Sequence, residues 1–235
     1  MNQPRIVSRD EWLAARRELL AKEKALTRAH DALSAERRTL PMVRVDKSYV
    51  FDTPDGPKTL AELFDGRSQL VVYHFMMGPD WEEGCPSCSL LVDHIDGAAV
   101  HLAQRDVTLL AISRAPMEKI AAFKRRMGWR LPWVSSHRND FNWDYQVSFK
   151  PEEVGSGKMY YNFAMGNFPA AEAPGISVFY KNASGDVFHS YSTYARGGEP
   201  FIGTYSFLDL VPKGRDEDAL TFPMAWVRHH DRYDR

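Results

Sequence analysis

The sequence predicts an α/β domain built on a mixed β-sheet. Two nearly continuous apolar runs, 68–78 and 107–115, have the length and composition of buried central strands. Each is followed by an amphipathic stretch typical of a helix, 89–106 and 116–129. A β-hairpin is predicted further along the chain, over 176–195. Strands that alternate with helices and end in a hairpin indicate a sheet that turns partly antiparallel.

A long helix precedes the sheet, over residues 8–41. Ser8 followed by Glu11 has the pattern of a capping box, and Pro41 marks the stop of the helix. Apolar residues seven positions apart give one narrow stripe on an otherwise charged rod, namely Trp12, Leu19, Leu26 and Leu33. We expect this N-terminal helical arm, residues 1–41, to lie along its own domain. The alternative is a homodimer formed through this helix, although the companion positions are weak for a coiled coil.

The sheet-forming domain is predicted to span residues 42–211, and residues 212–235 to form a C-terminal extension. Within the domain, 49–64 predicts a strand, a turn and a short helix, and 131–136 predicts a further short strand. Residues 150–174 interrupt this rhythm, because they are rich in Gly, Pro, Ala and aromatic residues without a clear period. A long loop insertion of this kind inside a compact domain is typically functional or mobile.

The composition excludes several classes of partner. Lys and Arg together number 30 and Asp and Glu 31, a balance that gives no basis for binding nucleic acid or an anionic membrane. The most apolar run is far too short to cross a bilayer, and the first residues lack the apolar core of a signal peptide. We therefore expect a cytoplasmic protein that binds neither nucleic acid nor membrane.

The chemistry of the chain centres on its two cysteines, Cys85 and Cys88. In a reducing compartment a C-x-x-C pair indicates redox or metal chemistry and not a structural disulfide. The pair lies between a predicted strand and a predicted helix, where free N–H groups and the helix dipole favour a thiolate on Cys85. Cys88, one turn on, is placed to resolve a mixed disulfide. Pro86 suits the first helical position, and Trp81 is expected to cover the sulfurs.

Acidic residues before the first cysteine oppose this activation. Asp80, Glu82 and Glu83 immediately precede Cys85, and nearby carboxylates disfavour a thiolate. The outcome depends on where those side chains point. We expect a Cys85 thiol less acidic than that of a strong disulfide oxidant, and hence a reducing or weakly poised pair.

Two alternatives to a redox pair remain open. A metal site at the pair lacks a second C-x-x-C, so zinc would need further ligands such as His74, Asp93 or His94. A pair that is merely buried and inert is the other alternative. No phosphate loop, dinucleotide fingerprint or Ser–His–Asp signature is found in the sequence.

The motifs resemble a known family. The stretch "VVYHFMMGPDWEEGCPSC", followed by "LLAISRAPMEKIAAFKRRMGWRLPWVSS" and "GISVFYKNASGDV", is similar to the thioredoxin-like superfamily. Together with "EKALTRAHDALSAERRTLPMV", "PKGR" and the closing "HHDRY", it resembles the bacterial thioredoxin-like family catalogued as domain of unknown function 899. The resemblance spans almost the whole chain. It implies a three-layer fold, in which a mixed sheet has helices on both faces and the domain is extended at both ends. It also implies that no cofactor is bound.

The superfamily implies two competing activities. Thioredoxins exchange disulfides through both cysteines, with Cys85 attacking and Cys88 resolving. Peroxiredoxins place their cysteine after a Pro-x-x-x-Thr-x-x pattern, which neither cysteine follows here. They also stabilise the thiolate with an arginine, a role for which Arg114 and Arg196 are candidates.

Two further residues carry implied roles. Thioredoxins have a proline just before the strand that faces the active site. Here that position is Gly175, and Pro174 lies one residue earlier. A buried acid in these proteins often shuttles the proton of the resolving cysteine, and Asp93 is the candidate. This displacement implies either that the proline has moved by one residue in this chain or that the substrate groove is built differently.

We therefore interpret the chain as a thiol–disulfide oxidoreductase that acts through Cys85 and Cys88. An unknown disulfide or peroxide substrate and a thiol electron donor would be its partners. The first alternative is peroxidase-like reduction of peroxides at Cys85. The second is a non-catalytic binding protein, or a metal site at the pair.

Overall fold

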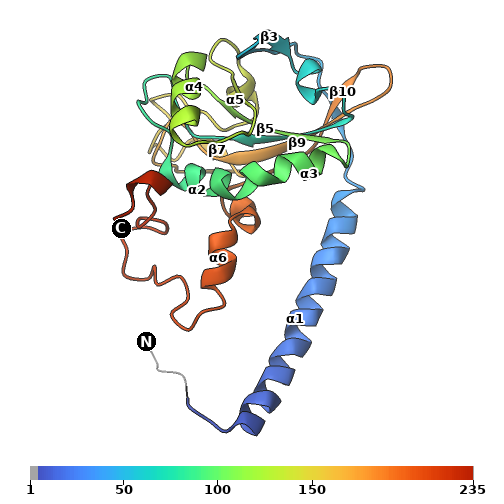
Figure 1. Cartoon of the computed structure of the whole chain (residues 1–235). Helices are drawn as coiled ribbons and strands as arrows, with labels where there is room; N and C mark the ends of the chain where they lie inside the picture. The colour runs from blue at the N-terminus through green and yellow to red at the C-terminus, as the bar shows by residue number, and fades with distance from the viewer. Residues whose placement is uncertain (1–4, 235) are drawn as a thin grey trace.

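The two apolar runs of the sequence form the centre of the sheet. In the computed structural model, which describes residues 5–234, they are β4 (Gln69–His74) and β5 (Val107–Ser113). The two strands pair in parallel, from Gln69 opposite Val107 to His74 opposite Ile112 (Figure 1). Because the chain must cross over to start β5 in the same direction, the helix α2 (Pro86–Ile95) lies between them.

The predicted hairpin supplies the antiparallel half of the sheet. Strand β9 (Gly175–Lys181) pairs antiparallel with β4, and β10 (Val187–Tyr194) pairs antiparallel with β9. Gly185 turns the hairpin with a φ of 88°, a conformation that favours glycine. Two parallel strands joined through a helix, followed by an antiparallel hairpin on the β4 side, give the thioredoxin-like arrangement that the sequence predicts.

Shorter elements complete the fold. Among the described residues the main sheet has the order β1-β10-β9-β4-β5-β6-β2-β3, and β7 and β8 form a separate pair. The other elements are β1 (Val43–Arg44), β2 (Val50–Thr53), β3 (Gly56–Thr59), η1 (Glu62–Phe64), η2 (Asp96–Ala98), α3 (Ala99–Ala103), α4 (Met117–Arg126), β6 (Trp133–Ser135), α5 (Phe141–Asp144), β7 (Met159–Tyr161), β8 (Ala164–Gly166), η3 (Ala195–Phe201), α6 (Gly203–Leu208) and η4 (His230–Arg232).

Two hydrophobic clusters stabilise the two faces of the sheet. Tyr73 and Ala111 point into the larger cluster, in which α2 and α4 pack against the strands. Val72 and Ile112, one residue away, point into the second cluster with α5 and η1. This alternation follows from the pleat of the strands, which sends successive side chains to opposite faces. Helices therefore cover both faces, as predicted.

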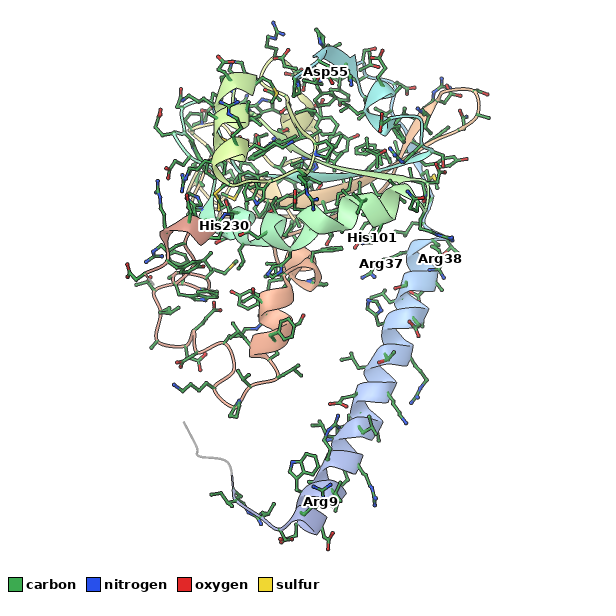
Figure 2. All side chains as sticks on the ribbon, viewed as in Figure 1. Arg9, Arg37, Arg38, Asp55, His101 and His230 are labelled. Atoms are coloured by element: carbon green, nitrogen blue, oxygen red, sulfur yellow. The ribbon has the colours of Figure 1, made fainter. Side chains whose placement is uncertain are left out.

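The N-terminal helix does not lie along its own domain. Helix α1 (Arg9–Arg37) has the predicted capping box, with Ser8 and Glu11 bonded to each other reciprocally, but it contains no buried residue. Figure 1 shows it leading away from the sheet, and in Figure 2 its side chains, from Arg9 to Arg37, project from the rod. The expectation of a helix packed on its own domain is wrong, because the helix runs away from the sheet and its apolar stripe stays exposed.

The long loop insertion and the C-terminal extension are both attached to the domain through packed side chains. Residues 150–174 contain the β7–β8 hairpin, and Met159 and Ala173 of this segment form a small cluster with Phe149. In the C-terminal extension, Met224 and Trp226 pack against the larger cluster and Val227 is buried. Within residues 5–234, no helix has the length and apolar character needed to cross a membrane.

Candidate active site

The two cysteines lie where a strand gives way to a helix. Cys85 is the N-cap residue of α2, and Pro86 occupies the first helical position, as predicted. The Cys85 N–H donates to the carbonyl oxygen of Met76 at 3.0 Å, which ties the start of the helix to the end of β4. Cys85 is half-buried, Cys88 is buried, and both are free thiols.

Close packing fixes the loop that leads into Cys85. A Cβ at Gly84 would lie 2.5 Å from the ring of Phe75 and 2.7 Å from the ring of Phe123. These distances are far inside van der Waals contact, so only glycine fits between the two rings. The loop backbone therefore has little freedom at the residue before the first cysteine.

The surroundings of Cys85 favour its thiolate. The neighbouring Cys88 side chain, and then the backbone N–H groups of Cys88 and Ser87, act to lower the pKa of Cys85. Burial acts in the opposite direction, but the donors outweigh it and lower the pKa of Cys85 to about 7. The free N–H groups exist because Cys85 is the N-cap, where the first turn of a helix has no internal acceptors.

Cys88 is kept as a thiol. Its burial, its hydrogen bond to Cys85 and the negative charge of that neighbour all raise the pKa of Cys88 far above its usual value. Tyr73, from β4, is also buried, and its pKa is raised first by burial and then by its neighbour Cys88. One acidic thiol therefore stands beside one proton-retaining thiol.

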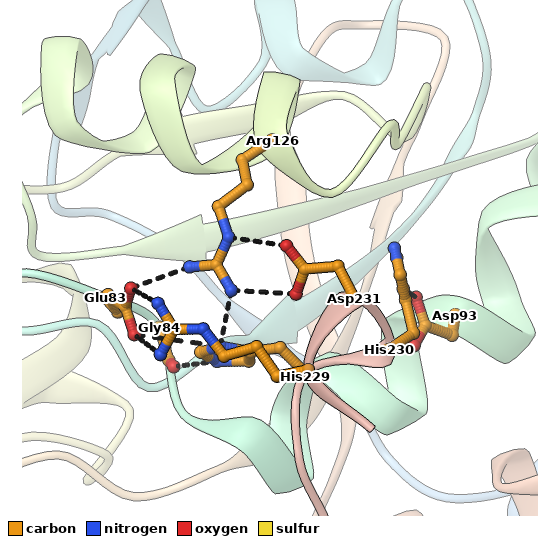
Figure 3. Close-up of polar contacts among 8 residues, drawn as sticks. Glu83, Gly84, Asp93, Arg126, His229, His230 and Asp231 are labelled. Atoms are coloured by element: carbon orange, nitrogen blue, oxygen red, sulfur yellow. Dashed lines mark hydrogen bonds and ion pairs between the residues drawn. The ribbon is translucent and has the colours of Figure 1, made fainter. Parts of the chain in front are cut away.

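Two of the three acidic residues before Cys85, Glu82 and Glu83, are paired with cations. Glu83 accepts hydrogen bonds from Arg126 at 2.7 Å and from Arg232 at 2.8 Å (Figure 3). Burial acts to raise the pKa of Glu83, but Arg232 and Arg126 outweigh it and the pKa is lowered. The exposed Glu82 reaches Lys119 at 3.2 Å. The opposition between carboxylates and thiolate that the sequence suggests is thus reduced by residues far away in the chain.

The end of the chain closes this cluster. His229 is buried, and its Nε2 lies 2.8 Å from the carbonyl oxygen of Gly84 (Figure 3). Asp231 accepts two hydrogen bonds from Arg126, at 2.8 Å each, and these lower the pKa of Asp231 to about 2. We call Glu83, Arg126, His229, Asp231 and Arg232 the tail clamp. It joins the C-terminus, α4 and the loop before Cys85.

A cavity of about 260 Å³ opens beside the two sulfurs. Apolar side chains from distant parts of the chain form most of its wall, including Tyr73, Ile176, Tyr194 and Met224. Pro174 lines it next to Gly175, which pairs with His74 at the end of β4. A Cβ at Gly175 would lie 2.7 Å from the Tyr194 ring, which explains the glycine where thioredoxins have proline.

The remaining sequence-derived candidates lie elsewhere. Trp81 is not among the residues that line the cavity, and its ring lies against Gly78. Arg114 pairs with buried Glu172 at 2.9 Å and stacks on Trp143. Its role as a thiolate partner is therefore replaced by a structural ion pair.

The role expected of Asp93 is not supported either. Its Oδ1 accepts hydrogen bonds from Trp129 at 2.7 Å and from His230 at 2.8 Å, and it does not line the cavity. The helix turns this carboxylate toward the tail and not toward the sulfurs. Arg196 does reach the rim of the cavity, where it pairs with Glu199 at 2.8 Å.

The residues considered as metal ligands are not gathered at the cysteines. His74 bonds to Ser177 at 2.8 Å on the far side of the sheet from Tyr73, and His94 bonds to Thr204 at 2.8 Å. In the part of the chain that the structure describes, no three His, Cys, Asp or Glu side chains are grouped so that they would hold a metal ion.

Sequence reasoning missed Tyr73 and the tail clamp. The signal for Tyr73 is the pleat, because a residue one position from His74 in a strand must face the opposite side, where α2 packs. The signal for the clamp is the alternation of His, Asp and Arg in "VRHHDRYDR". That pattern fits a solvated tail equally well, so the sequence does not decide between the two.

Comparisons with solved structures find thioredoxin-like proteins at low similarity. A peroxidoxin BcpB from Mycobacterium tuberculosis is 16% identical, with 71% of this chain and 94% of that chain covered and a TM-score of 0.44. A cysteine-to-serine mutant of peroxiredoxin Q from Xanthomonas campestris is 13% identical, with 72% of this chain and 97% of that chain covered and a TM-score of 0.46. A putative thiol:disulfide interchange protein DsbE from Chlorobium tepidum is 9% identical, with 71% of this chain and 98% of that chain covered and a TM-score of 0.41. Similarity at this level carries no argument about activity.

The sequence comparisons are more decisive. No curated protein is significantly similar to the chain. One family model, described as a bacterial protein of unknown function, matches residues 1–233. Since this match extends over the arm, the sheet domain and the tail clamp, the chain belongs to the bacterial family of unknown function DUF899.

Proposed function

We propose that the protein is a thiol–disulfide oxidoreductase in which Cys85 attacks and Cys88 resolves. The observation that carries this proposal is the position of the pair: Cys85 is the N-cap of α2, Cys88 is buried one turn further on, and both line the same cavity. In this position the pKa of Cys85 is lowered to about 7, whereas the pKa of Cys88 is raised. Two inert core cysteines would need neither the helix N-terminus nor the adjoining cavity.

The reaction follows from this difference. The Cys85 thiolate attacks one sulfur of a substrate disulfide, so that a new S–S bond forms, the old one breaks, and the departing thiolate takes up a proton. Cys88 then loses its proton and attacks the Cys85 sulfur, which releases the second substrate thiol. Two electrons pass from the pair to the substrate. An external dithiol returns the pair to its reduced state.

The surroundings of Cys88 fit the order of these steps. While Cys85 is a thiolate, its charge helps to raise the pKa of Cys88 and prevents early loss of the proton. Once Cys85 is bound in a mixed disulfide, this charge is gone. Cys88 then becomes easier to deprotonate at the moment when it is needed. Tyr73 lines the cavity together with Cys88.

Mass spectrometry of the reduced full chain treated with glutathione disulfide tests the proposal. We expect wild type to form a reversible disulfide between Cys85 and Cys88. Cys88→Ser is expected to retain one glutathione on Cys85, whereas Cys85→Ser remains unmodified. A glutathione adduct on Cys88 would reverse the assigned roles, and a wild type that never oxidises would refute the proposal.

Peroxide reduction at Cys85 is the alternative use of the same pair. There, Cys85 takes one oxygen from the peroxide to become a sulfenic acid, which condenses with Cys88 and releases water. Trapping of a sulfenic acid in Cys88→Ser, at peroxide rates far above the disulfide rates, would favour this reaction. The site lacks the Pro-x-x-x-Thr pattern that peroxiredoxins use, so we expect disulfides to react faster.

A further inference from the structure

Helix α1 leaves an apolar stripe without a partner in its own chain. Its four stripe residues, Trp12, Leu19, Leu26 and Leu33, are 53%, 51%, 72% and 46% exposed. The helix has no buried residue along its 29 positions. In proteins, a helix gains most of its stability from packing its apolar face against other elements. Helix α1 does not do so within its own chain.

The same chain has an apolar groove without a helix in it. The groove has a volume of about 600 Å³, larger than the cavity at the cysteines. Its floor is the sheet, at Val71, Leu109 and Val178, and its walls come from α3 and η3, at Leu102 and Phe201. No residue of α6 lines the groove.

The position of α1 excludes it from filling this groove in its own chain. Its last turns, at His30, Ser34 and Arg37, form the rim of the groove, and Arg37 stacks on Tyr191. From this rim the helix runs outward, away from the sheet (Figure 1). The stripe and the groove are therefore complementary surfaces that one chain keeps apart.

We infer that the protein is a two-fold dimer in which α1 of each copy lies in the groove of the other. A two-fold axis satisfies both stripes and both grooves at once, because the same two surfaces meet twice. The part of α1 that precedes the rim, residues 9–29, is about 31 Å long and 10 Å wide, so two such contacts bury about 1,200 Å² in total. That area lies at the lower end of the range of about 1,200–2,000 Å² found for stable complexes.

Sedimentation equilibrium of the reduced full chain measures the association. We expect wild type to have twice the mass of 26.9 kDa at micromolar concentration. Leu19→Glu combined with Leu26→Glu places charge on the stripe, and Ala98→Glu places a charged side chain in the groove without removing core volume. Each variant is expected to weaken the dimer at least tenfold.

A matched control separates the stripe from the charge. Arg17→Gln combined with Arg28→Gln changes the net charge of the chain by the same amount, on the opposite face of the helix. This variant should dimerise as wild type does. Circular dichroism checks that each variant is folded.

Three outcomes overturn the inference. They are a monomeric wild type, a dimer that survives both the stripe and the groove variants, and a dimer that only the stripe variant dissociates. The third outcome would mean that two α1 helices pair with each other. Hydrogen exchange on wild type supplies an independent measurement, in which α1 amides should gain protection as the protein concentration rises. Protection that is the same in dilute monomer would mean that α1 folds back on its own chain.

Discussion

The two ends of the chain are attached to the same domain in opposite ways. The N-terminal arm is a 29-residue helix with a capping box and no buried residue. The C-terminal extension has little regular structure, but it buries Val227 and His229 and bonds through Asp231 to α4. Regular secondary structure is therefore a poor guide to attachment. What ties a segment to a domain is the surface it buries and the polar groups it satisfies.

Truncating each end of the chain in turn should show the largest difference between them. We expect loss of residues 225–235 to lower the free energy of unfolding by more than about 3 kcal/mol, because buried side chains and charged hydrogen bonds are lost together. Loss of residues 1–38 should leave the unfolding of dilute monomer within about 0.5 kcal/mol of wild type. Urea denaturation followed by tryptophan fluorescence measures both. Equal losses at the two ends would contradict the contrast.

The packing around the cysteine loop predicts the next largest effect. Gly84→Ala would push a methyl group against Phe75 and Phe123, at a cost of about 2–3 kcal/mol in unfolding free energy. Gly97→Ala is the matched control, because nothing lies within 4 Å of a Cβ at that position. The control should be neutral in the same denaturation experiment. A tolerated Gly84→Ala would show that the loop can move away from the two rings.

Opening the tail clamp should connect stability to chemistry. Arg126→Met removes the cation shared by Glu83 and Asp231 and should cost about 2 kcal/mol. The freed carboxylate charge near the loop should also raise the pKa of Cys85 by about half a unit. Alkylation rates measured against pH report that shift.

The neighbouring arginine supplies the control for this variant. Arg125 is exposed on the same helix, so Arg125→Met changes the charge equally and should leave both quantities unchanged. If Arg126→Met destabilises the protein but leaves the pKa of Cys85 where it was, the clamp is structural only.

Local patterns in the sequence are sufficient for the centre of the fold. The two apolar runs, the hairpin and the helix start at Cys85 were predicted, because each depends on neighbours within a few residues. The tail clamp was not, since Arg126 and Asp231 are 105 positions apart and their pairing depends on the folded chain. The partners of Asp93 were not predicted for the same reason, because its carboxylate bonds to Trp129 and to His230 of the C-terminal tail.

The pH dependence of alkylation at each cysteine tests the central claim most directly. Thiolates and not thiols react with iodoacetamide, so the rate at a given cysteine rises as the pH passes its pKa. We predict a midpoint near pH 7 for Cys85, where the pKa is lowered to about 7, and almost no reaction at buried Cys88 over the same range. Peptide mass spectrometry identifies which residue is modified. A Cys85 midpoint at or above about 8.5, the value of an ordinary thiol, or equal rates at the two cysteines, would contradict the account.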